Sequence, residues 1–146
     1  MVDLLQVSLV PPFLVERLEQ EFTLHDFIDP ADPDGLLADI GPRIRGILAS
    51  GMKGPNADLI NRLENLEIIA SFSVGFDSTD VVAAQARGVI VTHTPDVLTG
   101  DVADLAMTFI LMAPRRIGEA ERYLRAGRWR QGRMDLGTTV RGKRLG

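Results

Sequence analysis

Few side chains of this chain could act as nucleophiles or bases near neutral pH. The 146 residues include two histidines, His25 and His93, and no cysteine. Thiolate nucleophiles, disulfides and cysteine-based metal sites are therefore excluded. Neither histidine belongs to a His-x-x-x-His or Asp-x-Asp-x-Asp-Gly spacing, so we predict no metal site. Redox chemistry in this protein would need a cofactor.

A serine nucleophile is a second kind of chemistry to consider. Ser71 to Gly75 (SFSVG) resembles a hydrolase nucleophile elbow in which serine replaces the first glycine. Ser73 would need a general base, but His25 falls on a weak predicted strand and His93 in a loop, where it could contact a ligand or cap a turn. No acidic residue is clearly aimed at either histidine. These observations disfavour a serine hydrolase.

A phosphate-binding loop is disfavoured in the same way. Gly137 to Arg144 (GTTVRGKR) is one residue away from G-x-x-x-x-G-K-[ST]. A phosphate-binding loop needs a hydroxyl on its magnesium, a strand before it and a helix after it, whereas here Arg144 replaces the hydroxyl and only two residues follow.

The turn Ser73-Val74-Gly75-Phe76-Asp77 offers a third chemistry, the binding of an anion. A turn that contains glycine can present neighbouring backbone N–H groups to a carboxylate. The same residues could equally form an ordinary strand-to-helix turn, and their spacing leaves both interpretations open.

Short apolar runs alternate with helical patterns over the first hundred residues and must position these turns. We predict strands at Leu4–Val10, Thr23–Phe27, Gly46–Ala49, Glu67–Phe72 and Val89–Thr92, and helices at Pro12–Glu21, Gly35–Ile40, Asn56–Leu63 and Thr79–Ala86. This order predicts an α/β fold, a doubly wound, parallel five-stranded sheet. Ligands of such sheets bind beyond the carboxyl ends of the strands, where the loops at residues 50–54, 73–77 and 93–96 would lie.

From Asp101 the sequence changes to the pattern of one long helix, with Thr99 as a possible N-cap and Gly127 at the end. Pro114 conflicts with this helix, because proline removes a hydrogen bond and clashes with the preceding turn. We therefore predict a bend near Ala113. Residues 131–146 have little periodicity and are predicted to be a connector. One apolar stripe follows the helix: Val102, Leu105, Ala106, Phe109, Met112, Ile117, Ala120 and Leu124.

Composition excludes several classes of protein. The chain is 45% hydrophobic with a net charge of −4, and no apolar run reaches the roughly 18 residues of a membrane span. Residues 111–146 hold ten basic and three acidic side chains, but the arginines are interleaved with apolar residues, so a helix end is favoured over a nucleic-acid tail. The N-terminus lacks a basic segment before its apolar run, so we expect no signal peptide and a cytoplasmic location.

Several motifs in order resemble one family. They are SFSVGFDSTDVVAAQARGVIVTHTPDVLTGDVADLAMTFIL from Ser71, Arg115-Arg116, Arg125 to Trp129 (RAGRW) and Gly142 to Gly146 (GKRLG). Together they are similar to the D-isomer-specific 2-hydroxyacid dehydrogenases, in the hydroxypyruvate, glyoxylate and hydroxyphenylpyruvate reductase branch. The resemblance is dense over residues 67–146 and looser before them.

The resemblance implies a flavodoxin-like substrate domain followed by a long linker helix. It implies that Val74 and Gly75 hold the substrate carboxylate through their backbone N–H groups. It also implies that the loop Ser50, Gly51, Met52 and Lys53 lines the substrate pocket, and that Val102, with Thr99 nearby, touches the nicotinamide of NAD or NADP.

The resemblance places the family's catalytic histidine, acidic residue and arginine beyond position 146, so no catalytic residue is assigned in this chain. No G-x-G-x-x-G occurs in the sequence, and we expect no strong cofactor binding by this chain alone. The implied organisation is a substrate-binding domain (1–100), a long interdomain helix (101–130) and a connector (131–146) to a nucleotide-binding domain absent here.

The implied partners are a small 2-oxo or 2-hydroxy acid and a second copy in a homodimer, but neither nucleic acid nor a membrane. The alternative function is a truncated, stand-alone module that binds a carboxylate or regulates a partner without catalysis. A receiver-type signalling domain of the same fold is disfavoured, because acidic residues are missing after the first and third predicted strands.

Overall fold

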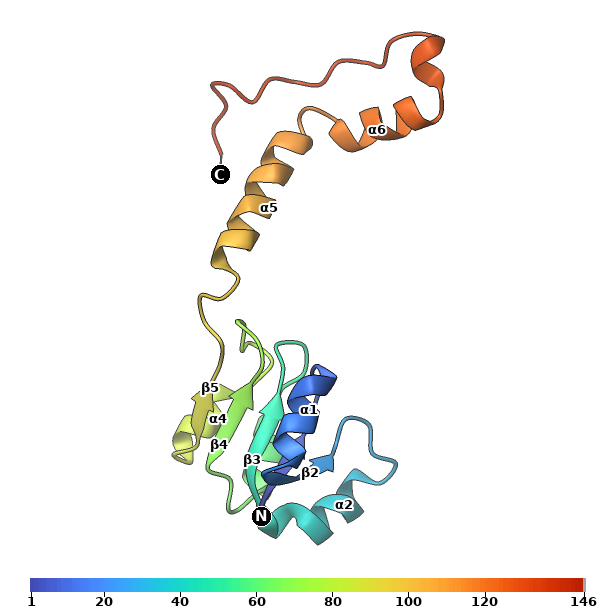
Figure 1. Cartoon of the computed structure of the whole chain (residues 1–146). Helices are drawn as coiled ribbons and strands as arrows, with labels where there is room; N and C mark the ends of the chain where they lie inside the picture. The colour runs from blue at the N-terminus through green and yellow to red at the C-terminus, as the bar shows by residue number, and fades with distance from the viewer. Residues whose placement is uncertain (146) are drawn as a thin grey trace. The chain divides into compact units, whose positions relative to one another are not determined.

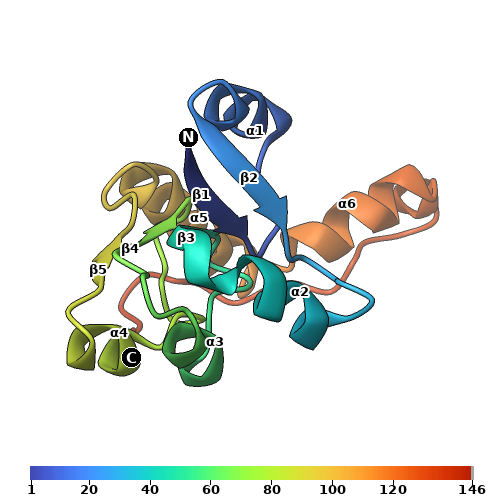
Figure 2. The same cartoon turned by 90° about the horizontal axis from the view of Figure 1, so that it is seen from below.

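The computed structural model describes residues 1–145. The chain forms two compact units, one of residues Met1–Val97 and one that begins at Leu98, and they are described in turn. Figures 1 and 2 label most elements of both units.

The first unit is a sheet of five parallel strands in the order β2-β1-β3-β4-β5, with helices in the connections. This is the doubly wound, flavodoxin-like arrangement that the sequence predicts. Its elements are β1 (Val2–Gln6), α1 (Pro12–Glu19), β2 (Phe22–Asp26), α2 (Pro33–Ile40), η1 (Gly41–Arg43), β3 (Ile44–Ala49), α3 (Ala57–Arg62), β4 (Ile68–Ser71), α4 (Val81–Ala86) and β5 (Ile90–Thr92).

The largest error in the predicted strands concerns β1. The strand was expected at Leu4–Val10 but runs from Val2 to Gln6, because the chain leaves the sheet before the prolines that begin α1. The other strands and helices of this unit agree with the prediction to within two residues at each end. Local periodicity thus located the five strands and four α-helices of the unit, misplaced some of their ends and missed η1.

The core of this unit lies between the sheet and helices α2, α3 and α4. Leu5, Ile47 and Ile69 are register partners across β1, β3 and β4, and each is at most 2% exposed. Figure 2 shows α1 on one face of the sheet and α2, α3 and α4 on the other. The buried apolar cluster contains residues of these three helices and none of α1. Because each such side chain stabilises the fold by roughly 1.5–3 kcal/mol, this layer fixes the strand ends that carry the loops.

Asparagine and aspartate side chains begin three of these helices. The carboxylate of Asp32 accepts a hydrogen bond from the Gly35 N–H, and that of Asp80 from the Ala83 N–H, both at 2.9 Å. The amide oxygen of Asn56 accepts one from the Leu59 N–H at 2.9 Å. These contacts satisfy N–H groups that have no partner within the helix, and so define where α2, α4 and α3 start.

The second unit contains α5 (Thr99–Met112), α6 (Ile117–Arg125) and η2 (Arg128–Arg130). The single long helix expected over residues 101–130 is therefore wrong, whereas the predicted bend near Ala113 is confirmed. Pro114 lies in the interruption, and Arg116 adopts a left-handed conformation (φ 53°) just before α6. Thr99 is also not an N-cap: it is the first residue of α5, and the capping residue is Leu98.

Two sets of hydrogen bonds are made by residues in the interruption between α5 and α6. The guanidinium of Arg116 donates to both carboxylate oxygens of Glu119, at 2.7 and 2.8 Å. The carbonyl oxygen of Pro114 accepts a hydrogen bond of 2.7 Å from the N–H of Thr138, which brings the segment after η2 back to the break. No helix within residues 1–145 is long and apolar enough to cross a bilayer.

Candidate functional site

The candidate site consists of the loops that follow the three neighbouring strands β3, β4 and β5. Because these strands are parallel and adjacent, their carboxyl ends share one edge of the sheet (Figure 1). The loops are Ser50–Gly54, Ser73–Asp77 and His93–Asp96. The predicted substrate-binding residues Ser50, Gly51, Met52, Lys53, Val74 and Gly75 all belong to the first two.

The first two loops are in direct contact. The hydroxyl of Ser78 donates to the carbonyl oxygen of Ser50 at 3.1 Å. A Cβ atom added to Gly51 would lie 2.3 Å from Oγ of Ser73 and 3.2 Å from the carbonyl oxygen of Gly75. Only glycine permits this approach, so Gly51 allows the β3 loop to pack against the β4 loop.

The second and third loops are joined by two hydrogen bonds and one aromatic contact. The N–H of Thr94 donates to the carbonyl oxygen of Ser73 at 2.9 Å. Nδ1 of His93 lies 2.9 Å from the carbonyl oxygen of Val74. The rings of His93 and Phe76 meet edge to face, with centroids 4.9 Å apart. The sequence left His93 either to contact a ligand or to cap a turn, and in the structure its ring contacts the turn at Val74.

The backbone of Val74 and Gly75 is accessible in this arrangement. Both residues are exposed, and within residues 1–145 the N–H group of neither donates to a protein acceptor. Two neighbouring donors on an exposed turn are what a carboxylate needs from the backbone. The turn at Val74 and Gly75 is therefore the candidate site for a carboxylate, as the sequence predicted.

Met52 and Lys53 are placed differently from each other. The side chain of Met52 is 96% exposed. The ammonium group of Lys53 donates to the carbonyl oxygen of Ile28, in the loop between β2 and α2. Lys53 there lines a pocket of about 430 Å³ whose walls include Phe27, Leu37 and Leu59 and no residue of the loop 73–77. In this conformation its charge is directed to the β2–α2 loop.

Thr99 and Val102 lie in the second unit, at the start of α5. Val102 is 60% exposed and occupies the first turn of the helix. Their predicted contact with a nicotinamide stays a prediction.

His25 has a carboxylate partner that sequence reasoning missed. Nε2 of His25 lies 2.6 Å from Oδ1 of Asp3, with each side chain 19% exposed. The statement that no acid is aimed at either histidine is therefore wrong for His25. Asp3 precedes His25 by 22 residues and meets it because β1 and β2 pair in register, which no local spacing reveals. Neither histidine hydrogen-bonds to Ser73 within the described part of the chain, so a serine–histidine pair is not formed.

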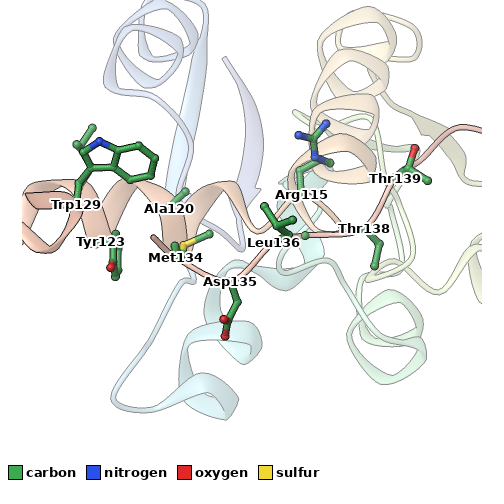
Figure 3. Close-up of a pocket in the computed structure, with 11 residues that line it drawn as sticks. Arg115, Ala120, Tyr123, Trp129, Met134, Asp135, Leu136, Thr138 and Thr139 are labelled. Atoms are coloured by element: carbon green, nitrogen blue, oxygen red, sulfur yellow. The ribbon is translucent and has the colours of Figure 1, made fainter. Parts of the chain in front are cut away.

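A larger hollow belongs to the second unit. Figure 3 shows side chains from α6, η2 and the following segment around a pocket of about 710 Å³. Its lining is Arg115, Ala120, Tyr123, Leu124, Trp129 and Met134–Thr139. Tyr123 donates to the carbonyl oxygen of Gly132 at 3.1 Å, which closes one end of the turn after η2.

Ionisable groups do not gather into a metal site in residues 1–145, where no three histidine or acidic side chains meet. The ion pair at the start of α6 shifts the pKa of both its members. The hydrogen bond from Arg116 lowers the pKa of Glu119 below its ordinary value, and the same bond raises the pKa of Arg116. Neither group lies in the candidate site.

Known proteins match nearly the whole of this chain. Residues 4–141 match the D-isomer specific 2-hydroxyacid dehydrogenase catalytic domain. The chain is 41% identical over 145 residues to the glyoxylate/hydroxypyruvate reductase A of Arabidopsis thaliana and 41% identical over 146 residues to the hydroxyphenylpyruvate reductase of Plectranthus scutellarioides. Each match covers 99% of this chain but 46% of the relative, so the chain spans about half the length of these relatives.

Solved structures agree in fold. The 2-hydroxyacid dehydrogenase of Ketogulonicigenium vulgare superposes with a TM-score of 0.84 at 40% identity, covering 95% of this chain and 44% of that one. The NADPH-dependent glyoxylate/hydroxypyruvate reductase of Sinorhizobium meliloti, in complex with NADP and malonate, gives a TM-score of 0.81 at 39% identity, over 96% and 43%. The chain belongs to the D-isomer specific 2-hydroxyacid dehydrogenase family, of which it carries the catalytic-domain sequence.

Proposed function

We propose that this chain is the substrate-binding portion of an NAD(P)-dependent 2-oxoacid reductase of the glyoxylate/hydroxypyruvate type. The observation that supports the proposal most strongly is the exposed turn at Val74 and Gly75, whose two N–H groups have no acceptor within residues 1–145. Two relatives of this chain are named for the reduction of glyoxylate, hydroxypyruvate or hydroxyphenylpyruvate. A 2-oxo acid offers a carboxylate of the size that two neighbouring amides can hold.

In this proposal the backbone of the β4 loop orients the substrate. The carboxylate would accept hydrogen bonds from the N–H groups of Val74 and Gly75, while the loop around Ser50 and Met52 borders the rest of the molecule. Charge-assisted hydrogen bonds of this kind are shorter and stronger than neutral ones. The turn thus contributes recognition and alignment, and no residue of this chain is assigned a proton-transfer role.

The nicotinamide would supply the hydride that passes to the 2-oxo carbon. The sequence contains no G-x-G-x-x-G turn, by which dinucleotide-binding domains hold the pyrophosphate. We therefore assign to this chain only the contact of Val102, and of Thr99 beside it, with the nicotinamide. In this proposal a nucleotide-binding domain binds NAD or NADP. Residues 1–100 form the substrate domain, 101–130 the interdomain segment and 131–146 the connector.

A second copy of the chain is the proposed partner of α5. Val102, Leu105 and Phe109 share one stripe of this helix and are 60%, 52% and 58% exposed. A helix that is apolar over so much of its surface normally packs against another element. Sedimentation velocity checks the proposed homodimer, and a monomer at every concentration would contradict it.

Calorimetric titration tests the binding proposal. Malonate, a small dicarboxylate, should bind saturably to this chain, whereas malonamide, which has the same skeleton and no charge, should not bind.

An activity assay is the second test. The chain with NADH or NADPH and hydroxypyruvate should show no oxidation of the nicotinamide. Equal binding of malonate and malonamide would remove the case for a carboxylate site, and turnover would refute the assignment of catalysis to other residues. Binding without any hydride transfer, even beside the nucleotide-binding part of a relative, would favour the stand-alone binding or regulatory module.

A further inference from the structure

The peptide unit between Val74 and Gly75 is fixed by a side chain from another strand end. Its carbonyl oxygen, on Val74, lies 2.9 Å from Nδ1 of His93. A carbonyl oxygen can only accept a hydrogen bond, so Nδ1 of His93 must carry the proton that is donated. The contact therefore sets the tautomer of the neutral ring, with Nδ1 protonated and Nε2 bearing the lone pair.

The same contact sets the direction of one of the proposed substrate-binding donors. No cis peptide bond occurs within residues 1–145, so the unit between Val74 and Gly75 is trans and planar. In a trans unit the C=O and N–H bonds point in opposite directions. Because His93 holds the Val74 carbonyl, the N–H of Gly75 must point away from His93, on the exposed turn.

Other contacts of the loop do not constrain this peptide unit. The N–H of Thr94 binds the carbonyl of Ser73, one peptide unit earlier, and the N–H of Thr79 binds the carbonyl of Phe76, two peptide units later. Between these two anchors, in the described part of the chain, the bond from His93 is the one that restrains the Val74–Gly75 plane. The edge-to-face contact with Phe76 holds the imidazole ring in turn.

We propose that His93 is a positioning residue of the carboxylate site: by donating from Nδ1 to the Val74 carbonyl, it aims the Gly75 N–H at the substrate carboxylate. This inference rests on the proposed function for the identity of the anion. It assigns His93 no contact with the reacting atoms and no proton transfer. It also gives a role to a loop residue that the sequence left between two interpretations.

Two substitutions separate the hydrogen bond from the ring. His93→Phe keeps an aromatic ring beside Phe76 and removes the donor. His93→Asn removes the ring and keeps an N–H donor at the position of Nδ1. His25→Asn is the control for loss of a histidine away from the loop. Circular dichroism and the amide spectrum of the core establish that each variant is folded.

The first measurements need no ligand. Long-range ¹H–¹⁵N spectra of the wild-type chain, at a pH where the ring is neutral, should show His93 as the Nδ1–H tautomer. The residual dipolar coupling of the Gly75 N–H should change in His93→Phe and return towards the wild-type value in His93→Asn. An Nε2–H tautomer, or a Gly75 coupling that is the same in all variants, would overturn the proposal. Should His93→Phe not fold, the tautomer and the His93→Asn coupling still decide it.

Titration with malonate tests whether the hydrogen bond from His93 to the Val74 carbonyl affects ligand binding. Loss of the restraint should weaken malonate binding by roughly two- to tenfold in His93→Phe, the range that one lost neutral hydrogen bond corresponds to. His93→Asn should recover most of the affinity, and His25→Asn should bind as the wild type does. If the wild type and His93→Phe bind malonate with equal affinity, the positioning role of His93 is contradicted, whereas the proposed carboxylate site is not. A wild-type chain that shows the expected tautomer and Gly75 response but does not bind malonate would instead contradict the proposed function.

Discussion

Gly51 and Ser73 lie so close that a single added carbon atom at Gly51 would come within 2.3 Å of the Ser73 hydroxyl. This contact joins the loop after β3 to the loop after β4. The separation between β3 and β4 is fixed by their ladder, in which Ala49 pairs with Ser71, so neither loop can retreat without disturbing the strand ends. The shape of the proposed carboxylate site thus depends on a residue that supplies no side chain.

Gly51→Ala should deform the site. The added Cβ also meets the carbonyl oxygen of Gly75 at 3.2 Å, so the Ser73 side chain must rotate and the Gly75 peptide must shift slightly. We expect a loss of stability of about 1–3 kcal/mol, as for overpacking elsewhere, together with weaker malonate binding. Urea unfolding and calorimetric titration measure the two effects. Gly132→Ala is the matched control, because a Cβ there meets nothing within 4 Å; equal behaviour of the two variants would show that the close approach is not needed.

Arg87 should stabilise the first unit well beyond an ordinary surface arginine. Its guanidinium donates to the carbonyl oxygens of Ile60, Leu63 and Glu64, at and just after the end of α3, where carbonyls cannot all find a partner within the helix. Arg87→Ala should lower the free energy of unfolding by about 2 kcal/mol, and Arg87→Lys should recover only part of it, because an ammonium group cannot reproduce the planar fork.

Arg45→Ala serves as the control for Arg87. Arg45 pairs with Glu67 on the surface, with side chains 52% and 57% exposed, so its removal should cost less than about 1 kcal/mol. Denaturant unfolding of the three variants gives the comparison. Equal losses for Arg87→Ala and Arg45→Ala would mean that the cap on α3 contributes no more than a solvated ion pair.

The ion pair of Arg116 and Glu119 should make the start of α6 sensitive to acid. Arg116 lowers the pKa of Glu119 below 4.5, so the folded state favours the ionised carboxylate. The stabilisation is present above the pKa that Glu119 has in the unfolded chain and is lost as the pH falls through its lower, folded pKa. Carbon-detected NMR should give a titration midpoint for Glu119 below 4.5 that rises in Arg116→Ala. A midpoint unaffected by that substitution would exclude Arg116 as the cause.

The sequence predicted those features that local patterns control. Short apolar runs located five strands, and Pro114 predicted the interruption that separates α5 from α6. Only the consequence of the proline was underestimated: a bend in one helix was expected, and two helices with a left-handed Arg116 between them were found. A proline removes one N–H, but the turn that replaces the helix also accepts a hydrogen bond at the Pro114 carbonyl from the N–H of Thr138, 24 residues away, which no local pattern predicts.

Contacts between distant segments were beyond the sequence patterns. The bond between His93 and Val74 joins residues 19 apart, that between Arg87 and Ile60 residues 27 apart, and that between Lys53 and Ile28 residues 25 apart. Each depends on the order in which strands pair in the sheet, and periodicity carries no information on that order. The family resemblance implied that Lys53 lines the substrate pocket; its ammonium group contacts the Ile28 carbonyl in the β2–α2 loop, and the implied role stays a prediction.

The central claim is that the backbone N–H groups of Val74 and Gly75 bind the substrate carboxylate, and an amide-resolved titration tests it most directly. The ¹⁵N-labelled chain is titrated with malonate, and with malonamide as the control, while every backbone N–H signal is followed. The account predicts saturable downfield shifts at Val74 and Gly75 with malonate alone, and smaller changes in the contacting loop at Ser50–Lys53. Saturation with no response at Val74 and Gly75, or the same response to both compounds, would contradict it.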